Sequence, residues 1–218
     1  IGGAEIVVLT LARELGADVY TTVANTENIR RMGFTVPVHT VGHIPKNAPW
    51  RQQLALLRLR FLDVSKKYDY FIIAGDWAVA SAVRHKPNLW YVHSPIRELY
   101  DLNRYVRENV LPKNIFSAFF TLSFDVWSWY NRRLNRTYVE HVGTIVSNSH
   151  TTQQRVKKYL QRDSTVINPP TDTSAFYFNA VGDYWLSVNR LSPAKRIEIQ
   201  MQAFSKLPAE KLVVVGSY

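Results

Sequence analysis

Cysteine is absent from the 218 residues of this sequence. Its absence excludes a disulfide framework, thiolate metal sites and cysteine nucleophiles, and it suits a reducing compartment. Methionine is scarce, with two residues, and the sequence opens on Ile1-Gly2-Gly3 rather than on Met. We therefore expect the chain to begin inside a folded unit, without a signal peptide.

Long apolar runs are also missing, since no stretch approaches the roughly 20 apolar residues that span a bilayer. The nearest, FSAFFTLSFDVWSWY over residues 116–130, is interrupted by Asp125 and several hydroxyls. We expect this segment to form a helix of the protein core rather than a membrane helix.

Acidic residues are few, because 17 Asp and Glu stand against 27 Lys and Arg and leave a formal net charge of +10. Such an excess favours an anionic partner: a nucleic acid, a phosphorylated small molecule or an acidic lipid surface. The basic residues are scattered in pairs, as at Lys157-Lys158, and form no long tail. Most of them are therefore interpreted as solvated surface charges.

Apolar residues make up 46% of the sequence and form short runs that alternate with helical patterns. Strands are predicted over residues 18–23, 35–41, 68–75, 88–93, 143–148, 164–168, 183–189 and 211–216. Helices are predicted over residues 4–15, 50–67, 95–109, 115–142, 150–161 and 194–207. This alternation indicates an α/β protein whose parallel sheets are covered by helices on both faces.

Residues 168–183 lack a clear period and are rich in turn formers, so we interpret them as a crossover between two domains. Residues 1–170 are predicted to form an N-terminal Rossmann-like domain whose first strand precedes Gly2. Residues 171–218 are predicted to hold the crossover and the start of a second domain, because roughly 35 residues cannot bury a doubly wound core.

Ligands of open parallel sheets bind beyond the carboxyl ends of the strands, and this rule selects three candidate positions. Gly2-Gly3 precedes a helix, where bare backbone N–H groups can face an anion, although a plain tight turn explains the pair as well. His93 ends a buried strand; an isolated histidine is more often structural, but this position favours a functional imidazole. Asp76 follows a strand in the same way and can equally cap a helix near Trp77.

A cluster of cations follows another strand, in YWLSVNRLSPAKR over residues 184–196. Lys195 is expected in the first turn of the next helix, where a cation is unfavourable because the helix dipole is already positive there. With Arg190 and Arg196, it concentrates positive potential that favours a docked diphosphate. A surface loop with solvated charges is an equal alternative from the local pattern alone.

Five motifs, in this order and over nearly the whole chain, resemble glycosyltransferase family 4, the retaining group-1 enzymes with the GT-B fold. They are IGGAE at 1–5, YVHSPIRELYD at 91–101, IVSNSHTTQQRVKKYL at 145–160, VINPPTDTSAFY at 166–177 and WLSVNRLSPAKRIEIQMQAF at 185–204. The second motif resembles that of the O-antigen-type mannosyltransferases. The resemblance implies two Rossmann-like, doubly wound domains. Residues 1–170 would form the acceptor-side domain, and residues 171–218 the crossover and the start of a nucleotide-sugar-binding domain that is only partly present.

The resemblance implies a catalytic and donor-binding role for Arg190 and Lys195, which would bind the donor's diphosphate and stabilise charge on the leaving group without a metal. Gly2 and Gly3 would bring backbone amides to the donor phosphates. His93 would lie beside the donor sugar and orient it near the anomeric carbon.

Three further residues are placed by the resemblance on the acceptor side or in support of His93: Asp76, Arg97 and Asp101. The implied reaction moves a sugar, with retention, from a nucleotide sugar (GDP-mannose above all) to a lipid-linked or glycan acceptor in cell-surface polysaccharide or glycolipid synthesis. No cofactor, metal or nucleic acid is expected, and the implied location is the cytoplasm.

The sequence departs from the family pattern at two positions of the cationic loop. Asn189 and Arg196 stand where glycine is usual or frequent, so the loop geometry is less certain there. The family's Glu-x7-Glu element would lie beyond Tyr218, and we expect the 218 residues alone not to turn over. The alternatives are a nucleotide-sugar epimerase of the same fold, in which VNRLSPAKR is not expected, and a basic nucleic-acid binder, for which no recognition motif is present.

Residues 50–67 place Trp50, Leu54, Leu57 and Phe61 on one stripe of a helix, with arginines elsewhere. A core-facing helix with a solvated basic back is the favoured interpretation. The alternative is a helix that lies on an anionic leaflet. With the net charge and the implied lipid-linked acceptor, this alternative supports the hypothesis of peripheral association with the inner face of the membrane.

Overall fold

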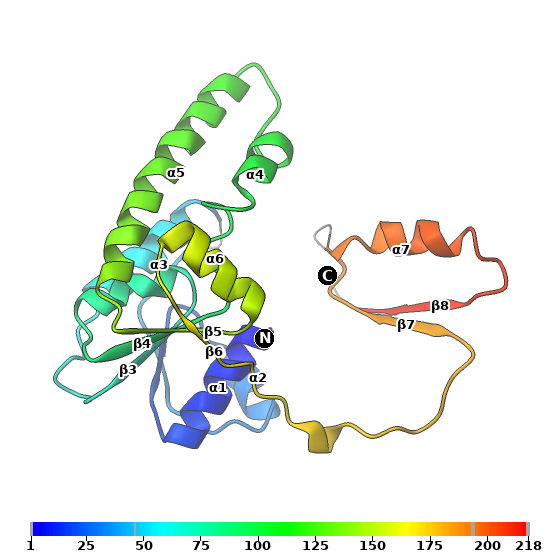
Figure 1. Ribbon diagram of the computed structural model, residues 1–218, viewed down its shortest axis with the longest axis horizontal. Coiled ribbons are helices and arrows are strands. Elements are labelled where there is room, and N and C mark those ends of the chain that lie inside the picture. The colour runs from blue at the N-terminus through cyan, green and yellow to red at the C-terminus, as the bar shows by residue number, and fades with distance from the viewer. Residues whose placement is uncertain (1, 46, 193–194, 217–218) are drawn as a thin grey trace. The chain divides into compact units, whose positions relative to one another are not determined.

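A computed structural model describes residues 2–45, 47–192 and 195–216. The chain divides into two compact units, Ile1–Pro170 (unit 1) and Thr171–Tyr218 (unit 2) (Figure 1). Parallel strands and helices make up both units. The assignment of unit 1 to the acceptor and of unit 2 to the donor stays a prediction.

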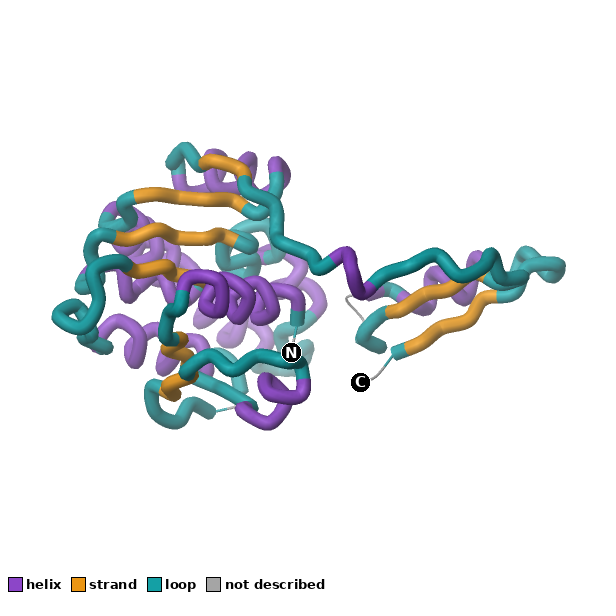
Figure 2. The backbone as a smooth tube through the Cα atoms, turned by 90° about the horizontal axis from the view of Figure 1, so that it is seen from below, coloured by secondary structure: helices purple, strands orange, loops and turns teal. Residues whose placement is uncertain are grey.

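The strands of unit 1 form two parallel sheets (Figure 2). The larger has the order β3-β4-β5-β6, with bounds Phe71–Ala74, Asn88–Val92, Thr144–Ser147 and Thr165–Val166. The smaller pairs β1 (Val19–Thr21) with β2 (Val38–Thr40). Because neighbouring strands are parallel, the carboxyl ends within each sheet lie at one edge.

Helices connect the strands of unit 1, beginning with α1 (Gly3–Leu15), which ends at Gly16 in the left-handed conformation (φ 61°). The other helical segments are α2 (Thr26–Arg31), α3 (Trp50–Phe61), the 3-10 helix η1 (Trp77–Val83), α4 (Asn103–Asn109), α5 (Ser117–Glu140) and α6 (His150–Leu160). Glycine adopts the left-handed conformation at no steric cost, which explains why α1 stops where the sequence predicts.

Strand β4 is buried on both of its faces. Trp90 and Val92 belong to one apolar cluster with Val139 of α5 and Val156 of α6. Tyr91, which points the other way, packs with Val7 of α1. Helices therefore cover both faces of a parallel sheet, and the predicted α/β class is confirmed.

Residues 116–130 are helical as predicted, within α5. The prediction that this part of the helix is buried in the core is wrong. The buried residues of α5 are Ser128, Asn131, Asn135 and Val139, whereas Phe119, Phe120, Trp129 and Tyr130 are exposed. The polar residues tolerate burial because they are hydrogen-bonded. The Asn131 carboxamide oxygen accepts from Gln53 at 3.0 Å, and that of Asn135 accepts from the Tyr100 hydroxyl at 3.0 Å.

The favoured interpretation of the 50–67 stripe is also wrong. Trp50, Leu57 and Phe61 are exposed, and the buried residue of α3 is Leu56. The reason is that α3 packs on η1 through the adjacent face, which carries Leu56.

Three predicted helices are longer than those observed. α3 stops at Phe61 rather than at residue 67, because the Asp63 carboxylate accepts from the backbone N–H of Ser65 (3.1 Å) and starts a turn. The helix predicted over 95–109 is limited to α4, since the residues before it form separate turns, such as the one from Ile96 to Leu99. The helix predicted over 194–207 is α7, which spans Ile197–Phe204.

Unit 2 is a single strand–helix–strand repeat. β7 (Trp185–Val188) pairs in parallel with β8 (Leu212–Val215), and α7 connects them after the short 3-10 segment η2 (Thr173–Ala175) that precedes β7. No described residue of unit 2 is buried. The rings of Trp185 and Phe204, 6.4 Å apart, join the sheet to its helix.

In the part of the chain that the structure describes, no helix has both the length and the apolar character needed to cross a bilayer.

Candidate functional site

The carboxyl edge of unit 1 is where the predicted residues of this unit gather. β3 ends at Ala74 and is followed by Gly75 and Asp76, and β4 ends at Val92 and is followed by His93. Gly75 has φ 98°, a conformation that side chains rarely adopt, so the chain leaves β3 in a turn that favours glycine. This turn carries Asp76 to the edge that also bears His93.

His93 has an imidazole nitrogen without a partner. Its Nε2 is buried and receives no hydrogen bond within the described structure. Burial lowers the pKa of His93, and the nearby Glu5 carboxylate opposes this effect. The ring is thus held neutral, 5.2 Å from the Tyr91 ring centroid, with a nitrogen free for a ligand group.

The N-terminus of α1 lies beside His93, but its first amide is not bare as predicted. The Gly2 N–H donates to the Glu5 carboxylate at 2.9 Å, because Glu5 in the first turn folds back onto the positive end of the helix. A Cβ on Gly3 would meet no atom within 4 Å, so packing does not require glycine there. Glu5, which sequence analysis did not single out, is the acidic group that acts on His93, and its place three residues after the N-cap was the available signal.

Asp76 caps a helical segment, which is one of the two roles predicted for it; its role at a ligand site stays a prediction. Its Oδ1 accepts from the Trp77 N–H at 3.0 Å and caps η1. Burial raises the pKa of Asp76, and the Glu98 carboxylate raises it further. A single cap does not need a buried carboxylate, since asparagine serves as well.

Asp76 also lines a cavity of about 350 Å³ at the carboxyl edge, whose lining mixes polar and apolar side chains. Thr21, Arg51 and Gln52 are among the other lining residues. The Gln52 Oε1 is buried without a hydrogen-bond partner within the described structure. A cavity with a guanidinium, a carboxyl and an unused amide oxygen suits a ligand rich in hydroxyls.

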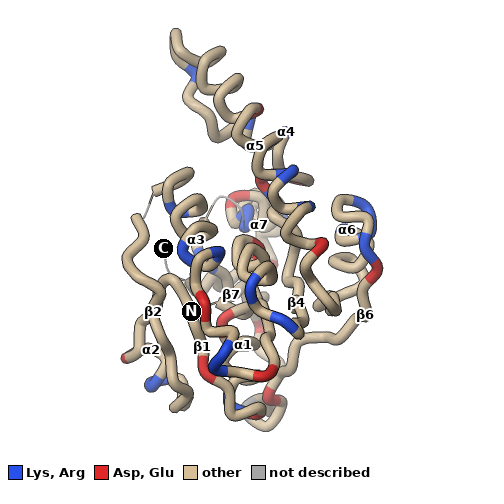
Figure 3. The backbone as a smooth tube through the Cα atoms, turned by 90° about the vertical axis from the view of Figure 1, so that its left-hand side faces the viewer, with Lys and Arg blue, Asp and Glu red and all other residues tan. Residues whose placement is uncertain are grey.

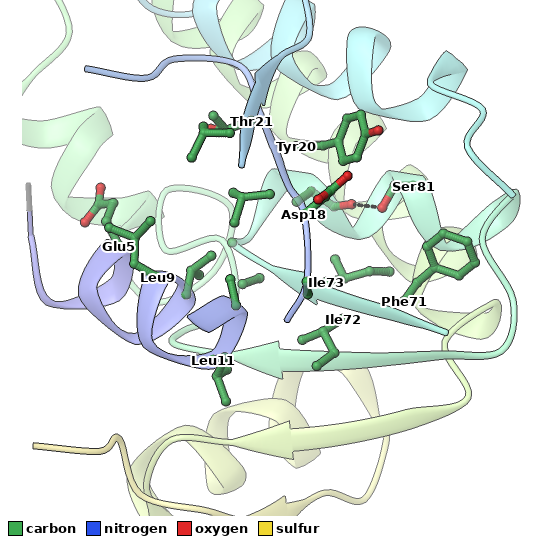
Figure 4. A pocket seen from close by; sticks show the side chains of 18 of the residues that line it. Glu5, Leu9, Leu11, Asp18, Tyr20, Thr21, Phe71, Ile72, Ile73 and Ser81 are labelled. Atoms are coloured by element: carbon green, nitrogen blue, oxygen red, sulfur yellow. Dashed lines mark hydrogen bonds between the residues drawn. The ribbon is translucent and has the colours of Figure 1, made fainter. Parts of the chain in front are cut away.

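A second cavity of unit 1, about 680 Å³, has a different character (Figure 4). It is lined mainly by apolar side chains, with Leu9 and Leu11 of α1 and Ile72 and Ile73 of β3 around it. It runs between β1 and β3 along their whole length. A parallel strand would fit the length and the apolar lining of this cavity, and the strand predicted before Gly2 stays a prediction.

Arg97 and Asp101 are paired with each other. The Arg97 Nε and Nη2 donate to the Asp101 Oδ2 at 3.1 and 2.9 Å, and Arg155 of α6 approaches the same oxygen at 3.4 Å. The carboxylate thereby ties the turn after His93 to α6. The predicted acceptor-side or supporting role of both residues stays a prediction.

Arg190 and Lys195 follow the carboxyl end of β7 in unit 2. Both are exposed, and neither forms an ion pair with a residue that the structure describes. Lys195 does not lie in the first turn of α7 as predicted. The helix begins two residues later, because Arg196 adopts a left-handed conformation (φ 52°), and the Lys195 N–H donates instead to the Ser192 carbonyl at 2.9 Å.

Asn189 and Gly216 fix the backbone conformation at the start of the loop that carries Arg190. The Asn189 N–H continues the β7–β8 ladder to the Val215 carbonyl (3.0 Å), and its carboxamide donates to the Ser187 hydroxyl (2.8 Å). A Cβ on Gly216 would lie 1.8 Å from the Asn189 carbonyl oxygen. Gly216 is therefore needed for the loop that carries Arg190, and sequence analysis missed this requirement.

Comparison with known proteins shows the family and the fold of the chain. The family model of Glycosyltransferase Family 4 matches residues 1–175. HepE of Anabaena, solved in complex with UDP and glucose, is similar to the chain with a TM-score of 0.67 and 16% sequence identity. The similarity covers 100% of this chain and 58% of that one, so the chain spans 58% of the length of HepE and shares its GT-B fold. A search of curated proteins finds no match. Because the family model covers well over half of its residues, the chain belongs to glycosyltransferase family 4.

Proposed function

We propose that the protein is a retaining glycosyltransferase of the cytoplasm that moves a sugar from a nucleotide sugar to a lipid-linked or glycan acceptor. The observation that carries this proposal is the pair of exposed cations Arg190 and Lys195, which lack an acidic partner among the described residues and follow the end of a parallel strand. Unpaired cations at this edge attract an anion such as a diphosphate. The UDP and glucose bound by HepE support a nucleotide sugar as the donor class, and GDP-mannose is our specific hypothesis.

In the proposed reaction, the bond between the anomeric carbon and the diphosphate oxygen breaks, and the acceptor oxygen bonds to that carbon on the same face. The acceptor's hydroxyl proton passes to the departing phosphate. Arg190 and Lys195 stabilise the negative charge that develops on the diphosphate. His93 is neutral and half-buried, and its free Nε2 hydrogen-bonds and orients the sugar rather than attacking it.

The amides at Gly2 and Gly3 bind donor phosphates in this proposal, which requires the Glu5 side chain to leave the Gly2 N–H. In this proposal, the cavity of about 350 Å³ lined by Asp76, Arg51 and Gln52 binds the sugar hydroxyls of the acceptor. Arg97 and Asp101 position the turn that follows His93.

The test is binding of nucleoside diphosphates and nucleotide sugars to the protein at its full natural length, followed by calorimetry and by melting temperature. A ligand that binds only the native state raises the Tm. Arg190→Ala and Lys195→Ala are each expected to weaken diphosphate binding on the order of tenfold or more, because each removes a charge-assisted contact.

Lys206→Ala is the matched control, since Lys206 is an exposed cation of the same unit that follows the other end of α7. It is expected to leave the affinity within about twofold, as surface charges contribute little. Diphosphate binding that is indifferent to both Arg190→Ala and Lys195→Ala contradicts the proposal. Conversion of the donor to an epimer, without transfer, favours an epimerase instead.

A further inference from the structure

Helix α5 has its apolar face toward solvent. Five residues at helical spacing are all strongly exposed: Ile115 (91%), just before the helix, then Phe119 (65%), Leu122 (64%), Val126 (57%) and Trp129 (63%). The opposite face is polar and buried. Here Asn103 donates to the Ser128 hydroxyl at 3.1 Å, beside the bonds of Asn131 and Asn135.

Burying polar groups while exposing large apolar ones is the reverse of an ordinary surface helix. A contiguous apolar stripe of this kind marks an interaction surface. The stripe belongs to the part of unit 1 that extends beyond the sheet, where α4 and α5 project together (Figures 1 and 3).

Charges are arranged around the stripe in a particular way. Between residues 114 and 131 the only charged side chain is Asp125, which is paired with Arg107 at 3.1 Å. Exposed cations lie at both ends, Lys113 before Ile115 and Arg133 one turn after Trp129. Neither cation is ion-paired with any described residue.

We propose that the exposed stripe of α5 docks on an anionic membrane surface, with the helix lying in the plane of the leaflet. The fifteen residues from Ile115 to Trp129 extend over about 21 Å at the helical rise of roughly 1.5 Å per residue, too short to cross a hydrocarbon core of roughly 30 Å. Helices that lie in the interface carry Trp, Phe and Leu on their buried face and cations at its border. Lys113 and Arg133 then meet lipid phosphates, in keeping with the net charge of +10.

The stripe of α3 suits this role less well, although Trp50 and Phe61 are exposed. The Phe61 ring is covered by the guanidinium groups of Arg60 and Arg84, each 5.8 Å from its centroid. No described cation covers a ring of the α5 stripe. The proposal does not rest on glycosyl transfer, because it uses none of the residues assigned to that reaction.

The experiment is co-sedimentation with mixed phosphatidylcholine–phosphatidylglycerol vesicles at low and high salt, with the triple variant Phe119→Gln, Leu122→Gln and Trp129→Gln. The variant is expected to lose vesicle binding by on the order of tenfold or more, because it removes most of the apolar area that enters the leaflet. Its Tm is expected to stay close to that of the natural protein, since the three side chains are exposed. Lys113→Gln with Arg133→Gln is expected to weaken binding at low salt only.

A matched control is Trp50→Gln with Phe61→Gln, which changes the α3 stripe and is expected to leave binding intact. Retention of full binding by the α5 variant, or loss confined to the α3 variant, overturns the proposal. The proposal is also overturned if the natural protein does not bind the vesicles and forms a dimer that the α5 variant abolishes, because the face is then an interface between copies.

Discussion

Asp76 is the residue whose environment departs most from what stability alone would select. A partly buried carboxyl with a raised pKa destabilises the folded state once pH exceeds the ordinary carboxyl value, because the unfolded chain ionises first. Stability is therefore lost as pH rises through the interval between the unfolded and folded pKa values. Such perturbed groups concentrate at functional sites, which supports the acceptor-side role of Asp76.

Asp76→Asn is accordingly expected to raise the Tm at neutral pH by a few degrees, because it removes the ionisable group and keeps the oxygen that caps η1. The gain should vanish in acid, where the carboxyl of the natural protein is protonated in both states. Thermal melts from pH 3 to pH 8 measure this difference.

Asp63→Asn is the control, and its change in Tm at neutral pH is expected to have the opposite sign. Hydrogen bonds from Ser65 lower the pKa of Asp63, so its carboxylate stabilises the fold above the ordinary carboxyl value and the variant loses stability at neutral pH. A Tm of Asp76→Asn that is lowered at neutral pH would show that the carboxylate itself is needed for folding.

At the scale of elements, the sequence predicts which segments are helices and strands better than it predicts which faces are buried. Gly16 and the apolar runs of β3 and β4 set their elements correctly because these signals are local. The inward face of α5 was misjudged because Asn131 and Asn135 become tolerable inside only through Gln53 and Tyr100, which are distant in sequence. The position of Lys195 was misjudged because Arg196 adopts a left-handed conformation, so that α7 begins after it. No residue pattern in the sequence predicts this conformation. Gly2, Gly3, Asp76 and His93 were selected by the rule of strand ends. Glu5 could have been found from its place three residues after the N-cap, whereas Gly216 depends on a contact visible only in three dimensions.

The cavity between β1 and β3 makes an element-scale prediction. It extends from Asp18 and Phe71, beside the start of the two strands, to Thr21 and Gly75 at their ends, and the first turn of α1 lines it at that carboxyl end. A parallel strand that leads directly into α1 would fill it and join the two sheets. Fusing an apolar segment of about five Val and Ile residues before Ile1 is therefore expected to raise the Tm of this 218-residue chain by several degrees.

A Gly-Ser segment of equal length is the control for that fusion, and it is expected to leave the Tm unchanged because it has no side chains to fill the cavity. Equal melting curves for the two fusions would show that the cavity does not accept a strand. Amide hydrogen exchange at β1 and β3 provides a second measure, since a new strand pairs their open edges.

At the scale of the whole molecule, the two units differ in how much they bury. Unit 1 holds every buried residue of the described chain, many of them in the clusters that contain β4 residues, whereas unit 2 holds none. Burial of apolar surface is the main favourable term in folding, so the stability of the chain resides in unit 1. The connection between η2 and β7 is exposed and aromatic, with Phe176, Tyr177 and Phe178 at 73%, 85% and 81% exposure.

Brief chymotrypsin treatment is expected to cleave first at Phe176, Tyr177 or Phe178, because the protease needs an exposed, locally flexible segment with an aromatic side chain. Mass spectrometry should identify a resistant fragment that ends within residues 176–178, and this fragment should keep the Tm of the intact chain within about 2 °C, since it retains the whole buried core. It should also keep vesicle binding, because the α5 stripe lies in unit 1.

Replacing the three aromatic residues with Gln serves as the control and should slow this cleavage without changing the Tm. First cleavage inside α5, whose exposed Phe119, Phe120 and Trp129 offer equal chemistry on a hydrogen-bonded helix, would mean that α5 is less ordered than its polar contacts require.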